Sequence, residues 1–125
     1  MIAGVDTGFF FALEEQHPIA LEVWKEQEIV TSVIVLYEIE KKLLGGRLSR
    51  WPTIMTDLRL AVSAIDLGEE IARQAARLSH KHGLPGLDSL ILATLLEARV
   101  KRIYTTDAHF ELCQAKGVEI INLAR

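Results

Sequence analysis

Short apolar runs alternate with helix-like patterns along the whole chain, and this alternation constrains the fold more than any other feature of the sequence. The strand-like runs cover residues 2–5, 28–31, 61–67, 102–105 and 118–123. The helix-like segments cover residues 7 onward, 18–25, 33–44, 49–60, 68–82, 87–99 and 109–116. Strands separated by helices require right-handed crossovers, so we predict an α/β fold. The predicted fold is a three-layer α/β/α sandwich with a mainly parallel central sheet of about five strands.

The length and composition fit one globular unit. A chain of 125 residues that is 50% hydrophobic can bury a continuous core, so we expect a single domain over residues 1–125. The lone Cys113 cannot form an internal disulfide and is expected to be a small apolar filler. No apolar run is long enough to cross a bilayer and no signal peptide is recognisable, so the expected location is cytoplasmic, with no membrane contact.

The charge of the chain gives no general reason to bind nucleic acid. The formal net charge is −3, so any contact with RNA must come from local basic clusters or through a bound metal ion. Lys41, Lys42, Arg47 and Arg50 form one such cluster near the end of a predicted helix. These side chains either contact phosphates or form a solvated face.

Four acidic residues follow the ends of predicted strands or lie in the first two turns of predicted helices: Asp6, Glu38, Asp88 and Asp107. Taken singly, each Asp has an ordinary explanation, because Asp is a common helix cap and turn residue. An acid among apolar neighbours loses hydration, however, and a cation, a proton or several hydrogen bonds must offset that cost. Since the ends of parallel strands meet at one edge of the sheet, we predict that the four acids share one divalent metal site.

The second acid is ambiguous between Glu38 and Glu40. A helical wheel groups Glu38 with the lysines and places Glu40 among apolar residues, so periodicity favours Glu40 as the buried acid. The wheel fails if Val33 and Ile34 lie outside regular helix. His109 stands two residues after Asp107 and either lines the site or is solvated.

Five segments, in this order and spacing, carry a resemblance to a known family. They are Val5-Asp6-Thr7 after the first strand, SVIVLYE at 32–38, LDSLILA at 87–93, IYTTDAHF at 103–110 and GVEIIN at 117–122. Over nearly its whole length the chain resembles the PIN-domain family of metal-dependent nucleases. Within that family it is similar to the small VapC-type toxins of prokaryotic toxin–antitoxin pairs.

The resemblance implies a site and an activity. The acidic quartet of the family falls on Asp6, Glu38, Asp88 and Asp107, so the family register selects Glu38 over Glu40. The hydroxyl often found two residues before the last acid falls on Thr105, and many relatives carry another acid at the position of His109. The implied function is a metal-dependent endoribonuclease, the toxin of a type II toxin–antitoxin pair. Mg²⁺ or Mn²⁺ would be the cofactor, RNA the substrate and a cognate antitoxin the inhibitor of a homodimer.

Three other functions account for the pattern less well. A phosphoacceptor domain needs paired acids after the first strand and an Asp after the third, but this chain offers Asp6 alone and then Asp66. An aspartyl phosphatase needs two aspartates flanking one residue, whereas Thr7 and Gly8 follow Asp6. The remaining alternative is a PIN-like protein-binding scaffold without catalytic turnover.

Overall fold

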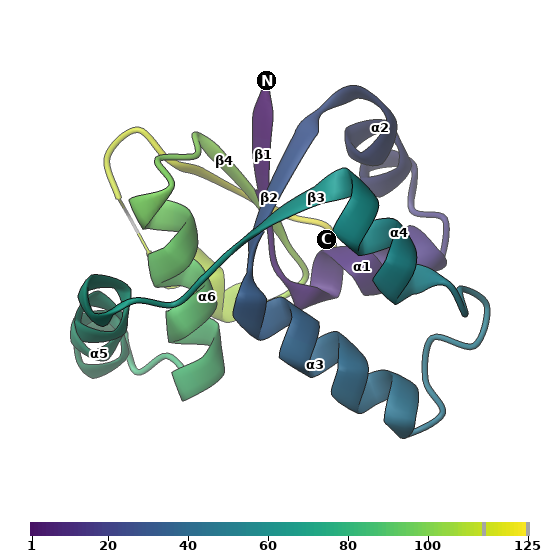
Figure 1. Ribbon diagram of the computed structural model, residues 1–125. Coiled ribbons are helices and arrows are strands. Elements are labelled where there is room, and N and C mark those ends of the chain that lie inside the picture. Colours follow the sequence, from purple (N-terminus) through teal and green to yellow (C-terminus); the bar gives the residue numbers. More distant parts are fainter. Residues whose placement is uncertain (114, 125) are drawn as a thin grey trace.

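The sheet is parallel throughout. The computed structural model describes residues 1–113 and 115–124, and it has five strands in the order β3-β2-β1-β4-β5 (Figure 1). Their bounds are β1 Ile2–Val5, β2 Glu28–Ser32, β3 Val62–Ile65, β4 Arg102–Thr105 and β5 Glu119–Asn122. Every neighbouring pair is parallel, with Gly4 beside both Val30 and Ile103. The predicted α/β class and the number of strands are confirmed.

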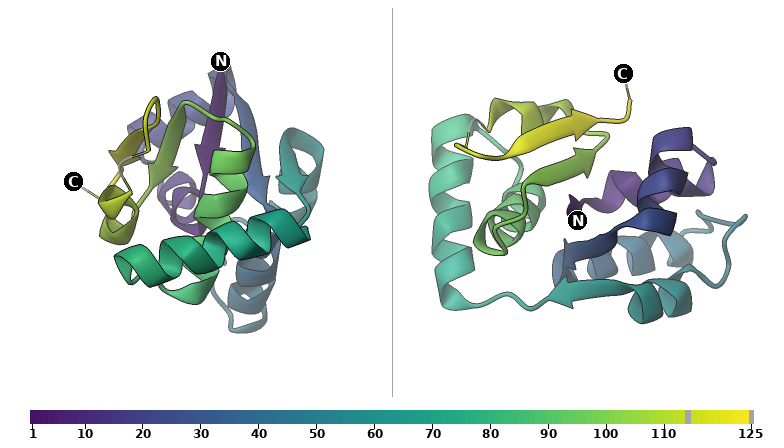
Figure 2. Two further views of the ribbon diagram at one scale, coloured as in Figure 1. Left: turned by 90° about the vertical axis from the view of Figure 1, so that its left-hand side faces the viewer. Right: turned by 90° about the horizontal axis from the view of Figure 1, so that it is seen from above.

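Helices cover both faces of this sheet. Their bounds are α1 Thr7–Glu14, α2 Pro18–Glu26, α3 Val33–Leu44, α4 Ile54–Ala61, α5 Glu69–His82, α6 Gly86–Glu97 and the short 3-10 helix η1 Ala108–Leu112. Helices α5 and α6 lie on one side, and α1, α2 and α4 lie on the other (Figure 2). The result is the predicted three-layer arrangement.

Helix α6 is the central helix of the fold. Its residues from Ile91 to Leu95 are buried, because the helix packs against α5, α3 and strand β2. A helix that is apolar on nearly all sides is stable in water only when neighbours cover it in this way. Phe9 and Phe10 of α1 fill the opposite side of the sheet and meet edge to face, 5.3 Å apart. The site described below therefore rests on two well-packed helices.

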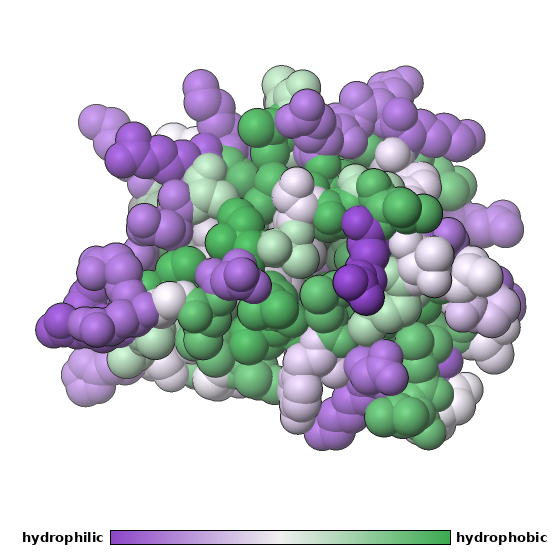
Figure 3. Space-filling view, in the orientation of Figure 1, coloured by the Kyte–Doolittle hydropathy of each residue, from purple (hydrophilic) through white to green (hydrophobic). Residues whose placement is uncertain are grey.

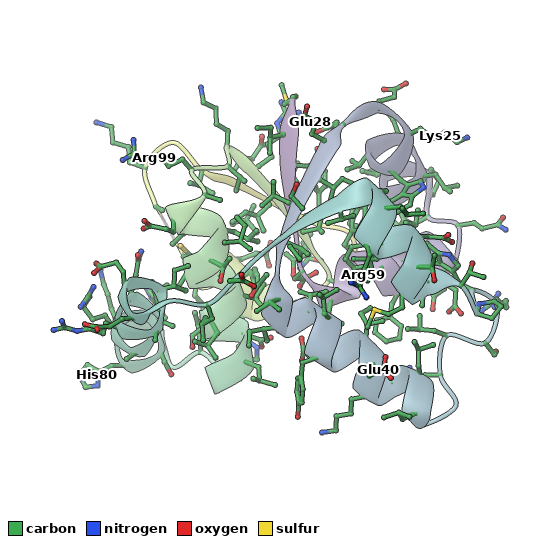
Figure 4. The ribbon with its side chains drawn as sticks, viewed as in Figure 1. Lys25, Glu28, Glu40, Arg59, His80 and Arg99 are labelled. Carbon is green, nitrogen blue, oxygen red and sulfur yellow. The ribbon has the colours of Figure 1, made fainter. Side chains whose placement is uncertain are left out.

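The surface divides by polarity. On the face shown in Figure 3, hydrophobic side chains gather across the middle, interrupted by a few hydrophilic ones such as Arg59 of α4 (Figure 4), and most hydrophilic side chains lie at the rim. Leu60 of α4 is 84% exposed and Leu44 of α3 is 81% exposed. Within the described residues, no helix is long and apolar enough to pass through a bilayer.

Two predicted helices differ from the observed ones. The helix expected over 49–60 begins only at Ile54, because Pro52 disfavours helical backbone at Trp51. The indole Nε1 of Trp51 instead donates a hydrogen bond to Oδ2 of Asp57 at 2.7 Å. The helix expected over 109–116 is the shorter 3-10 helix Ala108–Leu112. Asp107 caps its first turn, and Phe110 is its buried residue. Residue 114 of that prediction lies outside the described part of the chain.

Smaller differences concern element ends. The third strand spans Val62–Ile65 rather than 61–67, and α6 ends at Glu97 rather than at residue 99. Arg99 has a φ of 59°, a left-handed conformation that ends the helix. A side chain there costs more free energy than glycine would.

Candidate metal centre

Asp6 and Asp107 meet because β1 and β4 are neighbours. Asp6 follows β1 and Asp107 lies two residues beyond the end of β4, so both reach the carboxyl edge of the sheet. This is the edge at which parallel α/β sheets commonly bind ligands. Residues 101 positions apart in the sequence thus become neighbours through one strand pairing.

Asp6 is held by two donors in a buried position. It is 5% exposed, its Oδ1 accepts the backbone N–H of Phe9 at 3.0 Å, and its Oδ2 accepts the Thr105 hydroxyl at 2.5 Å. Burial nevertheless dominates and raises the pKa of Asp6 to about 6, with a further contribution from the charges of Asp107 and Glu38. Asp6 therefore caps helix α1 and also belongs to the group of acids at the edge of the sheet.

Thr105 connects the first and last acids. Its hydroxyl donates to Asp6 and accepts the backbone N–H of Asp107 at 2.9 Å. The side chain is completely buried at the end of β4. One hydroxyl therefore sets the positions of both acids relative to each other.

Asp107 is stabilised as an anion by its hydrogen bonds. Its Oδ1 accepts the backbone N–H of His109 at 2.8 Å and lies 2.9 Å from the imidazole Nδ1 of His109. Partial burial raises its pKa, but these contacts and a hydrogen bond shared with Asp88 outweigh burial and hold the pKa below its usual value.

Asp88 completes a cluster with Asp107 and His109. It lies in the first turn of α6, and one ligand atom from each of the three residues falls within 4.8 Å of the others. Partial burial, followed by the hydrogen bond to Asp107 and the charges of Asp107, Glu38 and Asp6, raises the pKa of Asp88 to about 7. Two carboxyl groups this close share a proton when no cation separates them.

Glu38, and not Glu40, faces this group. Glu38 is half-buried and accepts the hydroxyl hydrogen of Thr7, whereas Glu40 is exposed on the outside of α3 (Figure 4). The expectation from the helical wheel, that Glu40 is buried, is wrong. The predicted reason is also wrong, since Val33 and Ile34 belong to regular helix. The wheel failed because Tyr37 and Leu44, which it grouped with Glu40, are apolar but exposed.

Two residues of the site received no role in the sequence analysis. Thr7 orients Glu38, and its only sequence signal was its position directly after Asp6. Gly8 permits a close approach, because a Cβ atom there would lie 1.9 Å from Oγ1 of Thr106, the residue before Asp107. A glycine in a helical first turn is a weak signal by itself, so only the packing reveals its reason.

The donor set suits a hard divalent cation. The structure brings all four predicted acids to one edge of the sheet, and no Lys or Arg of the described residues forms an ion pair with any of them. Converging carboxylates without cationic partners repel one another, and oxygen donors are the ligands that Mg²⁺, Mn²⁺ and Ca²⁺ prefer. Ligation by these residues stays a prediction.

The fold and the site together define an α/β protein with a parallel sheet and a cluster of carboxyl groups at the carboxyl edge of that sheet. The sequence profile of the PIN domain matches residues 4–115. The chain belongs to the PIN domain family. A comparison of the sequence with curated proteins finds no match.

Solved structures share the fold over nearly the whole chain. VapBC2 from Rickettsia felis, bound to a promoter DNA fragment, has a TM-score of 0.71 at 19% identity and covers 98% of both chains. A toxin–antitoxin complex from Klebsiella pneumoniae has a TM-score of 0.71 at 18% identity, covering 97% of both. VapC20 from Mycobacterium tuberculosis, described as a sarcin–ricin loop cleaving toxin, has a TM-score of 0.72 at 21% identity, covering 93% of this chain and 98% of that one. At these identities the likeness concerns the fold.

Proposed function

We propose that this chain is a divalent-metal-dependent endoribonuclease and the toxin of a type II toxin–antitoxin pair. The observation that carries the proposal is the convergence of four carboxyl groups, two with pKa values raised to about 6 and about 7, without a Lys or Arg partner among the described residues. Such repulsion costs stability, and a cation-dependent function explains why a chain would carry it. The PIN family membership and the VapC-type neighbours support the same activity.

Asp6, Asp88, Asp107 and Glu38 are the residues we propose as metal ligands. Mg²⁺ or Mn²⁺ bound to them would supply Lewis-acid activation of water and would neutralise charge on the scissile phosphate. Asp107 enters this role already ionised, because its hydrogen bonds keep its pKa low. Asp88 and Asp6 must lose protons first, which couples metal binding to pH.

The remaining residues hold the acids in position. Thr105 fixes Asp6 against Asp107, and Thr7 fixes Glu38. Glu38, as the proposed proton acceptor, would take a proton from the attacking water during phosphodiester hydrolysis. His109 supplies a nitrogen where many relatives are expected to carry an acid, so the outer part of the site has one negative charge fewer.

The test combines metal binding with RNA cleavage. Purified protein is titrated with Mn²⁺ and assayed on an RNA pool, with Asp88→Asn as the disabling variant and Asp66→Asn, an exposed acid between β3 and α5, as the matched control. We expect wild type and Asp66→Asn to bind and cleave, and Asp88→Asn to do neither. Tight Mn²⁺ binding without cleavage of any RNA would favour the scaffold alternative instead.

The proposed partners are an antitoxin and a second copy of this chain. Tyr37 and Leu44 are 53% and 81% exposed on α3, the same helix that carries Glu38. Large apolar side chains left in water beside a polar site are typical of surfaces that a partner covers. Co-expression with the protein encoded next to this one, followed by light scattering of wild type and of Tyr37→Ser/Leu44→Ser, would test both associations. A monomer that captures no neighbouring gene product would contradict them.

A further inference from the structure

A large cavity lies at the opposite end of the sheet from the acids. It has a volume of about 710 Å³ and is formed by the start of β1, the segment between α6 and β4, and the segment before β5. In Figure 1 these segments meet at the top and upper left of the molecule, near the N-terminus, whereas β1 and β4 run away from them toward the acidic site. A volume of several hundred Å³ is the size at which small ligands bind.

The rim of this cavity is cationic. Arg99 and Lys101 line it, and neither forms an ion pair with any described residue. Arg102 also lines it but is paired with Glu119, with 3.2 Å between Nε and Oε1. Figure 3 shows hydrophilic side chains projecting from this upper edge, and Figure 4 places Arg99 there. Unpaired cations beside a hollow attract an anion.

A second, smaller hollow continues the first. It has a volume of about 340 Å³, shares Arg99, Val100 and Lys101 with the larger cavity, and adds Lys116. Lys116 is also without an ion pair among the described residues. Arg99, Lys101 and Lys116, three cations without ion pairs among the described residues, therefore line two adjoining hollows.

The floor of the cavity is aliphatic. Ile2, Ala98, Val100 and Val118 supply its apolar surface, and Ile2 is 46% exposed. A flat heterocycle can lie against aliphatic side chains and gain from their removal from water. The lining of the larger cavity contains no Asn, Gln, Ser or Thr side chain, and the smaller hollow adds only Gln74, so the site offers few groups to distinguish one base from another.

We infer that this cavity binds a nucleoside phosphate, with the base on the aliphatic floor and the phosphate between Arg99, Lys101 and Lys116. The site is separate from the acidic centre, and the inference does not rest on the proposed nuclease function. The ligand is either a free nucleotide or a terminal nucleotide of an RNA strand, since both present the same base and phosphate. Guanidinium and ammonium groups together are common phosphate ligands.

The backbone of Arg99 supports a role for its side chain. Its φ of 59° is a conformation that favours glycine, yet the chain has arginine there. No described residue forms an ion pair with that arginine. Arg99→Gly removes the cation and also relieves the left-handed backbone. A loss of binding in this variant therefore cannot be attributed to added backbone strain.

The experiment measures binding calorimetrically in EDTA, so that phosphate cannot bind through a metal at the acidic centre. The probes are AMP, adenosine, inorganic phosphate and a short 5′-phosphorylated RNA. We expect AMP to bind more tightly than adenosine or phosphate alone, and Arg99→Gly to weaken AMP binding by about tenfold, as expected for loss of a charge-assisted contact. Arg59→Ala, which removes an exposed arginine of α4 elsewhere on the surface, should leave AMP binding unchanged.

Several results would overturn the inference. These are the absence of AMP binding, equal binding of phosphate and AMP, and an equal loss of AMP binding in Arg59→Ala. Competition between the phosphorylated RNA and AMP would identify an RNA end as the source, and RNA that fails to compete would identify a free nucleotide. The nuclease assay with Mn²⁺ is independent, so failure of either proposal leaves the other testable.

Discussion

The two ends of the sheet differ in charge and in packing. At the carboxyl end, acids are held by hydrogen bonds from Thr105, Thr7 and the Phe9 backbone, and two of them have raised pKa values. At the amino end, Arg99 and Lys101 surround an open cavity without ion pairs among the described residues. The net charge of −3 conceals this separation. Local charge depends on which loops the sheet brings together, and it indicates possible binding sites better than the net charge of the chain does.

The largest effect is expected at the acidic end. Asp88→Asn removes one of two carboxyl groups that share a hydrogen bond, so we expect RNA cleavage to fall roughly 100-fold or more. The metal-free protein should become more stable, because like-charge repulsion is relieved. Cleavage assays and urea denaturation measure the two effects. If this variant cleaved RNA at the wild-type rate, the assignment of Asp88 to the metal site would be wrong.

The next effect distinguishes two acids on one helix. Glu38→Gln keeps an acceptor for the Thr7 hydroxyl but removes the charge, and it should lower cleavage by roughly 10- to 100-fold. Glu40→Gln changes an exposed side chain and should alter cleavage less than about twofold. Measuring the RNA cleavage rates of both variants side by side shows which of the two acids acts in the reaction. A loss of activity confined to Glu40→Gln would show that the family register misleads here.

A smaller effect is expected from the hydroxyl that joins two acids. Thr105→Val leaves the Asp6 oxygen and the Asp107 N–H without their shared partner, so Mn²⁺ affinity should fall about tenfold. Thr94→Val is the matched control, since Thr94 is equally buried but its hydroxyl contacts Leu90 and Ser32. Calorimetry with Mn²⁺ should detect a loss in the first variant alone, and equal losses would mean that only general packing is affected.

The pH dependence of stability should reverse when metal is added. Asp6 and Asp88 have folded-state pKa values of about 6 and about 7, above the ordinary 3.8, so the metal-free folded state binds more protons than the unfolded state between about pH 4 and pH 7. Stability should therefore be lost as pH rises through this window, by about 2–3 kcal/mol for the buried Asp6. Saturating Mn²⁺ should stabilise more as pH rises, because it replaces these protons. Urea denaturation at stepped pH, with and without Mn²⁺, measures this, and parallel curves would argue against metal binding.

The smallest effect is expected at the amino end. Arg99→Gly relieves a left-handed backbone at a helix end and should raise the free energy of unfolding by about 0.5–1 kcal/mol. The control is Gly83→Arg, which places a side chain at a φ of 68° and should have the opposite sign. Thermal unfolding measures both. A loss of stability in Arg99→Gly would mean that the arginine side chain supports the fold rather than a ligand.

The prediction of the fold succeeded where the pattern was strong and failed where local contacts intervened. The helix over 33–44 was predicted with its observed bounds, because Ser32 caps it and Gly45 and Gly46 follow it. The helix over 49–60 was predicted too long, since the turn at Trp51 and Pro52 depends on a contact with Asp57 that periodicity does not reveal. For the candidate site, Asp6, Asp88 and Asp107 were recognisable by their positions at element ends, whereas Glu38 lies within a helix and was selected by the family resemblance. Thr7 and Gly8 were not recognisable, because their roles depend on Glu38 and Thr106.

The amino-acid sequence by itself determined the succession of strands and helices along the chain and the positions of Asp6, Asp88 and Asp107 at the ends of these elements. Hydrophobic periodicity and capping act over only a few residues, so they can be recognised without tertiary structure. Tertiary structure decided that β1 lies between β2 and β4, that Glu38 and not Glu40 faces the other acids, and that Asp6 and Asp88 hold protons at higher pH than free aspartate. These outcomes depend on which distant segments pack together, since burial and neighbouring charges exist only once the sheet has formed.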